Sequence, residues 1–151
     1  ANYNAPGQVV ISGEIEAVET AGETLREAGA RRVIPLNVSG AFHSPLMESA
    51  RQELEEMLAG TEIADPVFPV VANVSAEPVE TGPRARELLV SQLTGAVRWS
   101  DGILQIGRLG ISSFMEIGPG SVLTSLLRRI DRELQGRAVG DLEALRTLSA
   151  A

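Results

Sequence analysis

The chain has 151 residues, 44% of them apolar, and this length and composition suit one globular domain with a buried core. Its 13 basic residues, all arginine, face 20 acidic residues, and the net charge of -7 argues against a nucleic-acid partner, which needs a basic surface. The absence of cysteine excludes disulfides, thiolate metal ligands and a cysteine nucleophile, and with one histidine a transition-metal site is not expected.

No apolar run reaches the length of a membrane span, and the first residues, ANYNAPGQ, have neither the basic nor the apolar region of a signal peptide. We therefore expect a soluble, cytoplasmic protein with no membrane partner. The first residue is Ala, and a strand pattern begins almost at once. This predicts a piece of a longer protein, with removal of an initiator Met as the alternative.

The first part of the chain predicts one strand, helix, strand unit over residues 8–37. Residues 8–12, QVVIS, are β-branched and lie between turn residues, as in a buried strand. Residues 15–28 carry apolar side chains at three- and four-residue spacing, and a glycine ends the run, so a helix is expected. Residues 32–37 then predict a second strand. A change of composition near Val38 predicts a subdomain boundary.

The rest of the chain continues the alternation of helix and strand. Helices are expected where apolar residues recur at helical spacing, and strands where short β-branched or aromatic runs occur. The expected helices are 45–58, 83–93, 97–109, 121–134 and a short one after 140, and the expected strands are 66–73 and 111–117. Residues 75–82 are polar and predict a surface loop. This order of elements predicts an α/β fold with a mostly parallel sheet.

His43, the only histidine, is the strongest candidate for a catalytic residue. The ordinary pKa of a histidine side chain lies near neutrality, so the residue suits a general base. Ser44 and Pro45 follow it as a helix N-cap and a first helical residue, which would place His43 in the turn before a helix. A surface or capping histidine is the alternative, and the residues alone leave both open.

The chain offers this base no nucleophile. The GxSxG motif of a nucleophile elbow does not occur, and Ser44, an adjacent N-cap, is not expected to reach the imidazole of His43. Glu116, before the GPG turn of residues 118–120, is the best-placed carboxylate, and we expect its role to be structural. The same GPGS stretch lacks the lysine and spacing of a phosphate loop. The residues therefore predict a base without a nucleophile.

Four segments carry a resemblance to a known family. They are ANYNAPGQVVISG at 1–13, VSGAFHSPLM at 38–47, SQLTGAVRW at 91–99 and FMEIGPGSVLTSLLRR at 114–129. In order and spacing they resemble the C-terminal half of bacterial malonyl-CoA:acyl carrier protein transacylases. The resemblance implies an α/β fold in which residues 39–151 are the C-terminal part of an α/β-hydrolase-like acyltransferase domain. Residues 1–38 would be the second half of a ferredoxin-like small subdomain.

The resemblance also implies an activity, the transfer of malonyl from coenzyme A to the phosphopantetheine thiol of acyl carrier protein through a serine ester. His43 would be the base that deprotonates first the serine and later the thiol. Gln92 matches the residue whose backbone carbonyl receives the other imidazole N–H and fixes the tautomer. Phe42 matches malonyl-selective members, because its ring leaves less room for an α-methyl branch. No cofactor is implied beyond the thioester substrates.

Two further groups of residues match the family pattern. Asn2, Asn4 and Gln8 match a segment in the cleft between the subdomains, where they would meet the pantetheine arm; hydrogen bonding in turns and at strand ends is the alternative. Four arginines match basic positions that would face the acidic carrier protein, or else they serve only solubility. These are Arg31, Arg32, Arg128 and Arg129.

The family's N-terminal half does not occur in this sequence. That half holds the GHSLGE nucleophile elbow, a glutamine-rich oxyanion loop and the arginine that binds the malonyl carboxylate. The missing half is therefore an implied partner, and the chain alone is expected to be inactive. Two other functions stay open: a piece of a polyketide synthase acyltransferase domain, and a non-catalytic module that binds the carrier protein.

Overall fold

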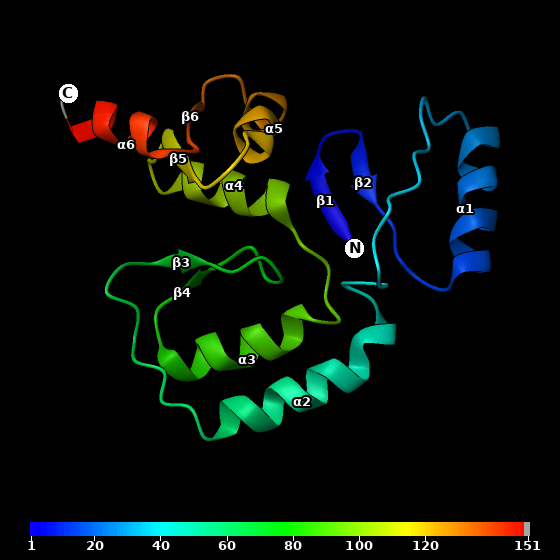
Figure 1. Ribbon diagram of the computed structural model, residues 1–151, viewed down its shortest axis with the longest axis horizontal. Coiled ribbons are helices and arrows are strands. Elements are labelled where there is room, and N and C mark those ends of the chain that lie inside the picture. The colour runs from blue at the N-terminus through cyan, green and yellow to red at the C-terminus, as the bar shows by residue number, and fades with distance from the viewer. Residues whose placement is uncertain (150–151) are drawn as a thin grey trace.

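A computed structural model describes residues 1–149, which form short strands and helices (Figure 1). Within these residues the strands make three separate two-stranded sheets. The strands are β1 (Asn2–Ala5), β2 (Gln8–Val10), β3 (Val70–Val71), β4 (Pro78–Val79), β5 (Ser113–Ile117) and β6 (Gln135–Val139). The helices are α1 (Ile15–Glu27), the 3-10 helix η1 (Pro45–Met47), α2 (Glu48–Ala59), α3 (Gly82–Gln92), α4 (Trp99–Arg108), α5 (Val122–Ile130) and α6 (Leu142–Ser149).

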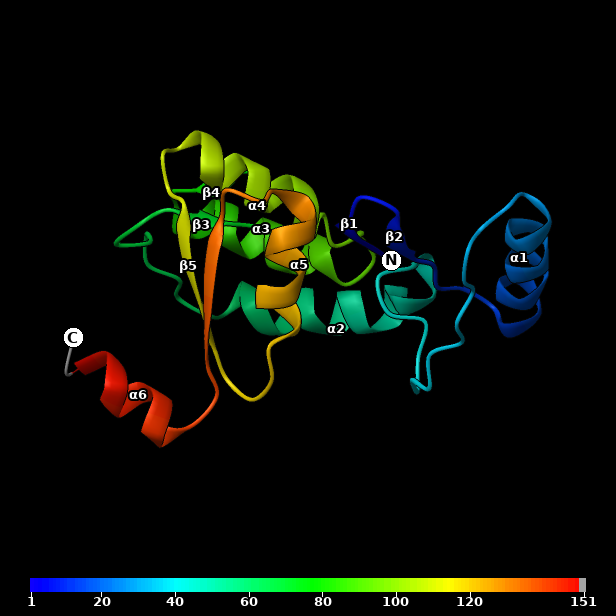
Figure 2. The same cartoon turned by 90° about the horizontal axis from the view of Figure 1, so that it is seen from above.

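The main core lies where β5 and β6 meet α4 and α5. β5 and β6 pair in parallel along their full lengths, and α5 lies alongside them (Figure 2). Ile103, Leu127 and Leu134 are buried together at the centre. A Cβ at Gly136 of β6 would stand 2.7 Å from Leu127 Cδ1 and 2.9 Å from Thr124 Cγ2, so a side chain there would require these two side chains of α5 to shift. α5 therefore packs closely on β6 at this glycine.

The N-terminal hairpin of β1 and β2 is antiparallel and is fastened to the segment between α3 and α4. The backbone N–H of Tyr3 donates to Val97 O at 2.9 Å, and the N–H of Val97 donates to Ala1 O at 2.7 Å. Gly7, in the hairpin turn, has a φ of +72°, a conformation that glycine adopts without strain. This hairpin also contacts α4 and α5, so it joins the main core.

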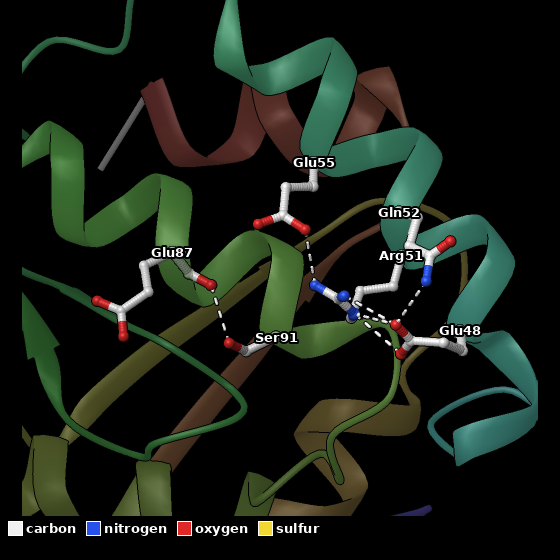
Figure 3. Close-up of polar contacts among 6 residues, drawn as sticks. All are labelled: Glu48, Arg51, Gln52, Glu55, Glu87 and Ser91. Atoms are coloured by element: carbon white, nitrogen blue, oxygen red, sulfur yellow. Dashed lines mark hydrogen bonds and ion pairs between the residues drawn. The ribbon is translucent and has the colours of Figure 1, made fainter.

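Helices α2 and α3 lie side by side, with the β3–β4 pair above α3 in the view of Figure 1. α2 is extended at its start by η1, and Arg51 forms ion pairs with Glu48 and Glu55 on the same helix (Figure 3). The first residue of α3 has no room for a side chain, since a Cβ at Gly82 would lie 1.8 Å from Ile63 O. The loop after α2 is therefore pressed against the start of α3.

Helix α1 stands apart at one end of the molecule (Figures 1 and 2). Its closest neighbour is the segment that follows it, because a Cβ at Gly22 would lie 3.2 Å from Val33 Cγ1. The strand predicted at 32–37 does not form: its backbone has no neighbouring strand within residues 1–149, and Ile34 is 67% exposed. The predicted strand, helix, strand unit of residues 8–37 is therefore wrong, although its helix is confirmed as α1.

The coarse prediction of an α/β fold is confirmed, but the mostly parallel sheet is not found in the described residues. Only the β5–β6 pair is parallel there, and the other two pairs are antiparallel. β1 was not predicted, and the strand at 66–73 shrinks to the two residues of β3 between Pro69 and the next turn. β6 was also missed, because the helix predicted over 121–134 ends at Ile130.

The other predicted helices are confirmed as η1 with α2, α3, α4 and α6. Residues 150 and 151, the end of the predicted 39–151 domain, lie outside the described part of the chain. Within that part, no helix is both long enough and apolar enough to cross a membrane.

Large apolar side chains cover much of the surface. Val67 is 99% exposed, Ile117 79% and Ile15 77%, and these residues come from three different regions of the chain. In residues 1–149 no large side chain is less than 2% exposed, so the core is thin for the length of the chain.

We expect the isolated chain to self-associate or to melt without a sharp transition, because its exposed apolar surface is large and its core is thin. Light scattering after size-exclusion chromatography, together with thermal circular dichroism, measures both properties. A monomer that melts in one cooperative transition would contradict the expectation.

Candidate active site

His43 lies in the turn between the extended segment 31–40 and η1. Its φ angle is +59°, in the left-handed region that residues with a Cβ rarely adopt. Such a conformation persists only where the surrounding contacts impose it, and residues of this kind concentrate at functional sites. Contacts of the neighbouring residues must therefore hold His43 in this backbone conformation.

Two serine hydroxyls hold the turn on either side of His43. Ser44 Oγ donates to Ala41 O at 2.6 Å and accepts from the backbone N–H of Leu46 at 3.3 Å, as the N-cap of η1. Ser12 Oγ donates to Phe42 O at 2.6 Å and so ties the turn to the end of the N-terminal hairpin. The predicted capping role of Ser44 is confirmed, and the residue is buried. The role of Ser12 carried no signal in the sequence.

The imidazole of His43 meets the end of α3. His43 Nδ1 lies 3.0 Å from Gln92 O, across 49 positions of sequence. Gln92 is the last residue of α3, so its carbonyl is one of the four that a helix leaves without an internal partner. A carbonyl only accepts, so this hydrogen bond requires the proton on Nδ1 and leaves the lone pair on Nε2.

The ring is thus held in the form that a general base needs. In residues 1–149 its Nε2 has no hydrogen-bond partner. Ser44 cannot serve this nitrogen as a nucleophile, because its hydroxyl proton is donated to Ala41 O. In residues 1–149 no serine hydroxyl is hydrogen-bonded to the ring, and the catalytic role of His43 stays a prediction.

The residues predicted to bind substrate do not all converge on His43. Phe42 is adjacent to it and 46% exposed. Gln8 instead accepts a hydrogen bond from Arg129 of α5 through its side-chain oxygen. Asn2 and Asn4 are half-buried on β1, the strand that pairs with β2, where Gln8 lies. Gln8 and Arg129 also border a shallow surface hollow of about 300 Å³, lined further by Ser121, Val122, Ser125 and Leu126.

Three of the four arginines predicted to face a carrier protein are free. Arg31, Arg32 and Arg128 are exposed, and the ion pairs of residues 1–149 do not include them. Arg129, also exposed, is the one engaged with Gln8. The guanidinium groups of Arg31, Arg32 and Arg128 therefore remain available to an acidic surface.

Glu116 has the structural role expected for it. Its two carboxylate oxygens accept the backbone N–H groups of Leu123 at 3.1 Å and Thr124 at 2.7 Å, and so cap the N-terminus of α5. The hydrogen bond from Thr124 is the main cause that lowers the pKa of Glu116. No three His, Asp or Glu side chains in the described residues gather closely enough to hold a metal ion.

Comparison with known proteins supplies the family. Residues 1–143 match the family described as the acyl transferase domain. The chain belongs to the acyl transferase domain family. The family resemblance seen in the sequence is thereby confirmed.

This acyl transferase chain is 44% identical over 145 residues to the malonyl CoA-acyl carrier protein transacylase of Bacillus subtilis, covering 96% of this chain and 46% of the relative. It matches an acyl carrier protein S-malonyltransferase from Vibrio cholerae with a TM-score of 0.94 and 41% identity, covering 98% of this chain and 48% of that one. A second solved structure is a malonyl-transacylase in complex with a type II polyketide synthase acyl-carrier protein. It matches with a TM-score of 0.94 and 45% identity, covering 97% of this chain and 48% of that one. The chain spans about half the length of the curated relatives it matches.

Replacing Ser44 by Ala should loosen the turn that carries His43. The change removes an N-cap and leaves Ala41 O without its donor, so we expect the free energy of opening this turn to fall by about 1–2 kcal/mol. Amide hydrogen exchange of residues 41–46 measures the loss, because local opening needs no cooperative transition of the whole chain.

Ser91→Ala is the matched control for this change. Its hydroxyl donates only to Glu87 O in the same helix (Figure 3), so we expect a loss below about 0.5 kcal/mol. Equal losses in the two variants would contradict the role given to Ser44.

Replacing Glu116 by Gln should lower the melting temperature at neutral pH but not in acid. Folding lowers the pKa of Glu116, so its stabilisation is present above the ordinary carboxyl pKa and is lost as pH falls through the lowered value. Melting curves of both forms between about pH 3 and pH 7 test this. The control is Glu23→Gln, an exposed carboxylate on α1, and a gap between wild type and Glu116→Gln that stays constant with pH would refute the prediction.

Proposed function

We propose that this chain is the base-bearing half of an enzyme that moves malonyl from coenzyme A to the phosphopantetheine thiol of acyl carrier protein. The observation that carries the proposal is the His43 imidazole, fixed through Nδ1 to Gln92 O with Nε2 free, in a chain of the acyl transferase family. The names of the relatives supply the acyl group and the acceptor: the Bacillus subtilis relative is a malonyl CoA-acyl carrier protein transacylase.

The proposed reaction has two acyl transfers through one serine. His43 Nε2 takes the proton from the serine hydroxyl, which attacks the thioester carbonyl, and the imidazolium returns that proton to the departing coenzyme A thiolate. His43 then takes the proton of the pantetheine thiol, which attacks the malonyl serine ester, and returns it to the serine oxygen. Gln92 O holds the imidazolium at both stages, in the place of the carboxylate of a Ser-His-Asp triad.

The serine, the oxyanion loop and the malonyl-binding arginine would lie in a second half that is not part of this sequence. Two observations support this: the chain spans about half of its relatives, and large apolar side chains are exposed on it. The division into a ferredoxin-like part, residues 1–38, and an α/β-hydrolase-like part, residues 39–151, belongs to the same proposal. The separation of α1 from the other elements supports a distinct unit around that helix, whereas the β1–β2 hairpin packs against α4 and α5.

The remaining assignments follow from the same resemblance. Phe42, beside the base, would favour malonyl over α-branched acyl groups. Asn2, Asn4 and Gln8 would meet the pantetheine arm. The arginines Arg31, Arg32, Arg128 and Arg129 would face the acidic carrier protein. We propose that the reaction uses no cofactor, and the cytoplasmic location stays a prediction.

A polyketide pathway is the alternative setting for the same chemistry. One of the matching structures is a malonyl-transacylase with a type II polyketide synthase acyl-carrier protein. The carrier proteins of the two pathways, offered in parallel to the restored enzyme, would separate the settings by relative kcat/KM.

The decisive experiment restores the second half. This chain would replace the matching half of the Bacillus subtilis relative, and transfer of labelled malonyl from coenzyme A to carrier protein would be measured. We expect activity in the hybrid and a loss of about 10²–10⁴-fold on His43→Ala, the contribution of a positioned general base. Ser91→Ala is the control and should retain full activity, since its hydroxyl bonds only within α3.

Two outcomes would overturn the proposal. A folded hybrid that is inactive, or one whose activity survives His43→Ala, removes the catalytic role. Carrier-protein binding by this chain in isothermal titration, with no activity in the folded hybrid, would favour a non-catalytic binding module instead.

A further inference from the structure

The side chain of Gln92 makes a contact with His43 that is separate from its backbone carbonyl. Its amide nitrogen Nε2 lies 3.2 Å from His43 Nδ1, while Gln92 O lies 3.0 Å from the same atom. The amide nitrogen is also 3.2 Å from Gly95 O, to which it donates. Because Gly95 O only accepts, the amide must present its NH₂ group, and not its oxygen, on this side.

Gly95 is well placed to hold the amide there. Its own N–H donates to Ser91 O at 2.9 Å, a hydrogen bond of helical spacing that ties Gly95 to the last turn of α3. A Cβ at Gly95 would lie 2.5 Å from Val74 Cγ2, so the residue is packed tightly and its carbonyl has a fixed direction. The two hydrogens of the amide can therefore point at Gly95 O and at His43 Nδ1.

The two contacts of Nδ1 make opposite demands on its proton. The bond to Gln92 O requires a hydrogen on Nδ1, whereas a bond from the Gln92 amide requires a lone pair on Nδ1. A neutral imidazole satisfies only one of these at a time. The first form leaves the lone pair on Nε2 and is the base; the second carries the hydrogen on Nε2 and cannot accept a proton there.

We propose that the Gln92 side-chain amide is a positioning group that competes with the Gln92 carbonyl for His43 Nδ1 and so sets the fraction of the base-competent tautomer. The carbonyl is closer, and the amide is shared with Gly95 O, so the tautomer with the hydrogen on Nδ1 is the major form. The other tautomer is a measurable minority. The proposal rests on the proposed function in one respect only, that the tautomer with a free Nε2 is called base-competent. The tautomers themselves exist whether or not the hybrid is active.

The chain allows a direct test because it has one histidine. With ¹⁵N-histidine incorporated into the full 151-residue chain, the two ring nitrogens give one pair of resonances that needs no residue assignment, and their couplings to the two ring C–H protons distinguish Nδ1 from Nε2. Recorded at about pH 9, well above the ordinary range for histidine, their positions report the populations of the two neutral tautomers. This measurement does not depend on activity, so its failure and that of the proposed function are distinguishable.

Two variants remove the competing donor while they keep the backbone carbonyl. Gln92→Met has a similar length and no N–H, and Gln92→Glu offers an acceptor in place of the amide. In both we expect the minor tautomer to fall by roughly 2- to 10-fold, the population change that one ordinary hydrogen bond produces. Ser91→Ala, one residue away on α3, should leave the tautomer ratio unchanged.

A purely structural amide, bonded only to Gly95 O, would change stability and not the tautomer ratio. A wild-type chain that shows only the tautomer with the hydrogen on Nδ1 therefore overturns the proposal, even if neither variant folds. Equal tautomer ratios in wild type and in a folded variant overturn it as well.

Discussion

The hydrogen bond between His43 and Gln92 O is the constraint to which the rest of the site is fitted. It joins a turn to the end of a helix across 49 positions, so it exists only if α2 and α3 pack side by side with these ends together. The acceptor is a carbonyl that the helix cannot use itself. The main partner of His43 Nδ1 is thus a backbone group, so this contact depends first on where α3 ends, and the Gln92 side chain can only adjust it.

The strain at His43 follows from the same geometry. His43 has a left-handed backbone, and the hydroxyls of Ser12 and Ser44 fix the two carbonyls that precede it, those of Phe42 and Ala41. One of these hydroxyls comes from the N-terminal hairpin and the other from the helix that follows. The turn is therefore over-determined by two independent elements, as a strained catalytic conformation requires.

Sequence reasoning recovered what local signals encode and missed what only a partner decides. The helices were predictable because apolar spacing and caps such as Ser44 act within a few residues. Residues 32–37 have the composition of a strand, yet a strand needs a neighbour that the described residues do not provide. In the site, the solitary histidine and its cap were visible, whereas the pairing with Gln92 came from family resemblance and the contact of Ser12 had no signal at all.

The proposed function links the exposed apolar side chains to the unpartnered imidazole nitrogen of His43. On that proposal, residues such as Ile117 and Val67 would gain the hydrophobic free energy of burial when a second half covers them. His43 Nε2 would gain a proton donor when that half brings a serine to it. If the same second half supplies both, then assembly of the core and assembly of the catalytic pair are one event. Catalysis would then depend on the apolar interface as directly as on the imidazole, because without that interface nothing fixes the distance between base and serine.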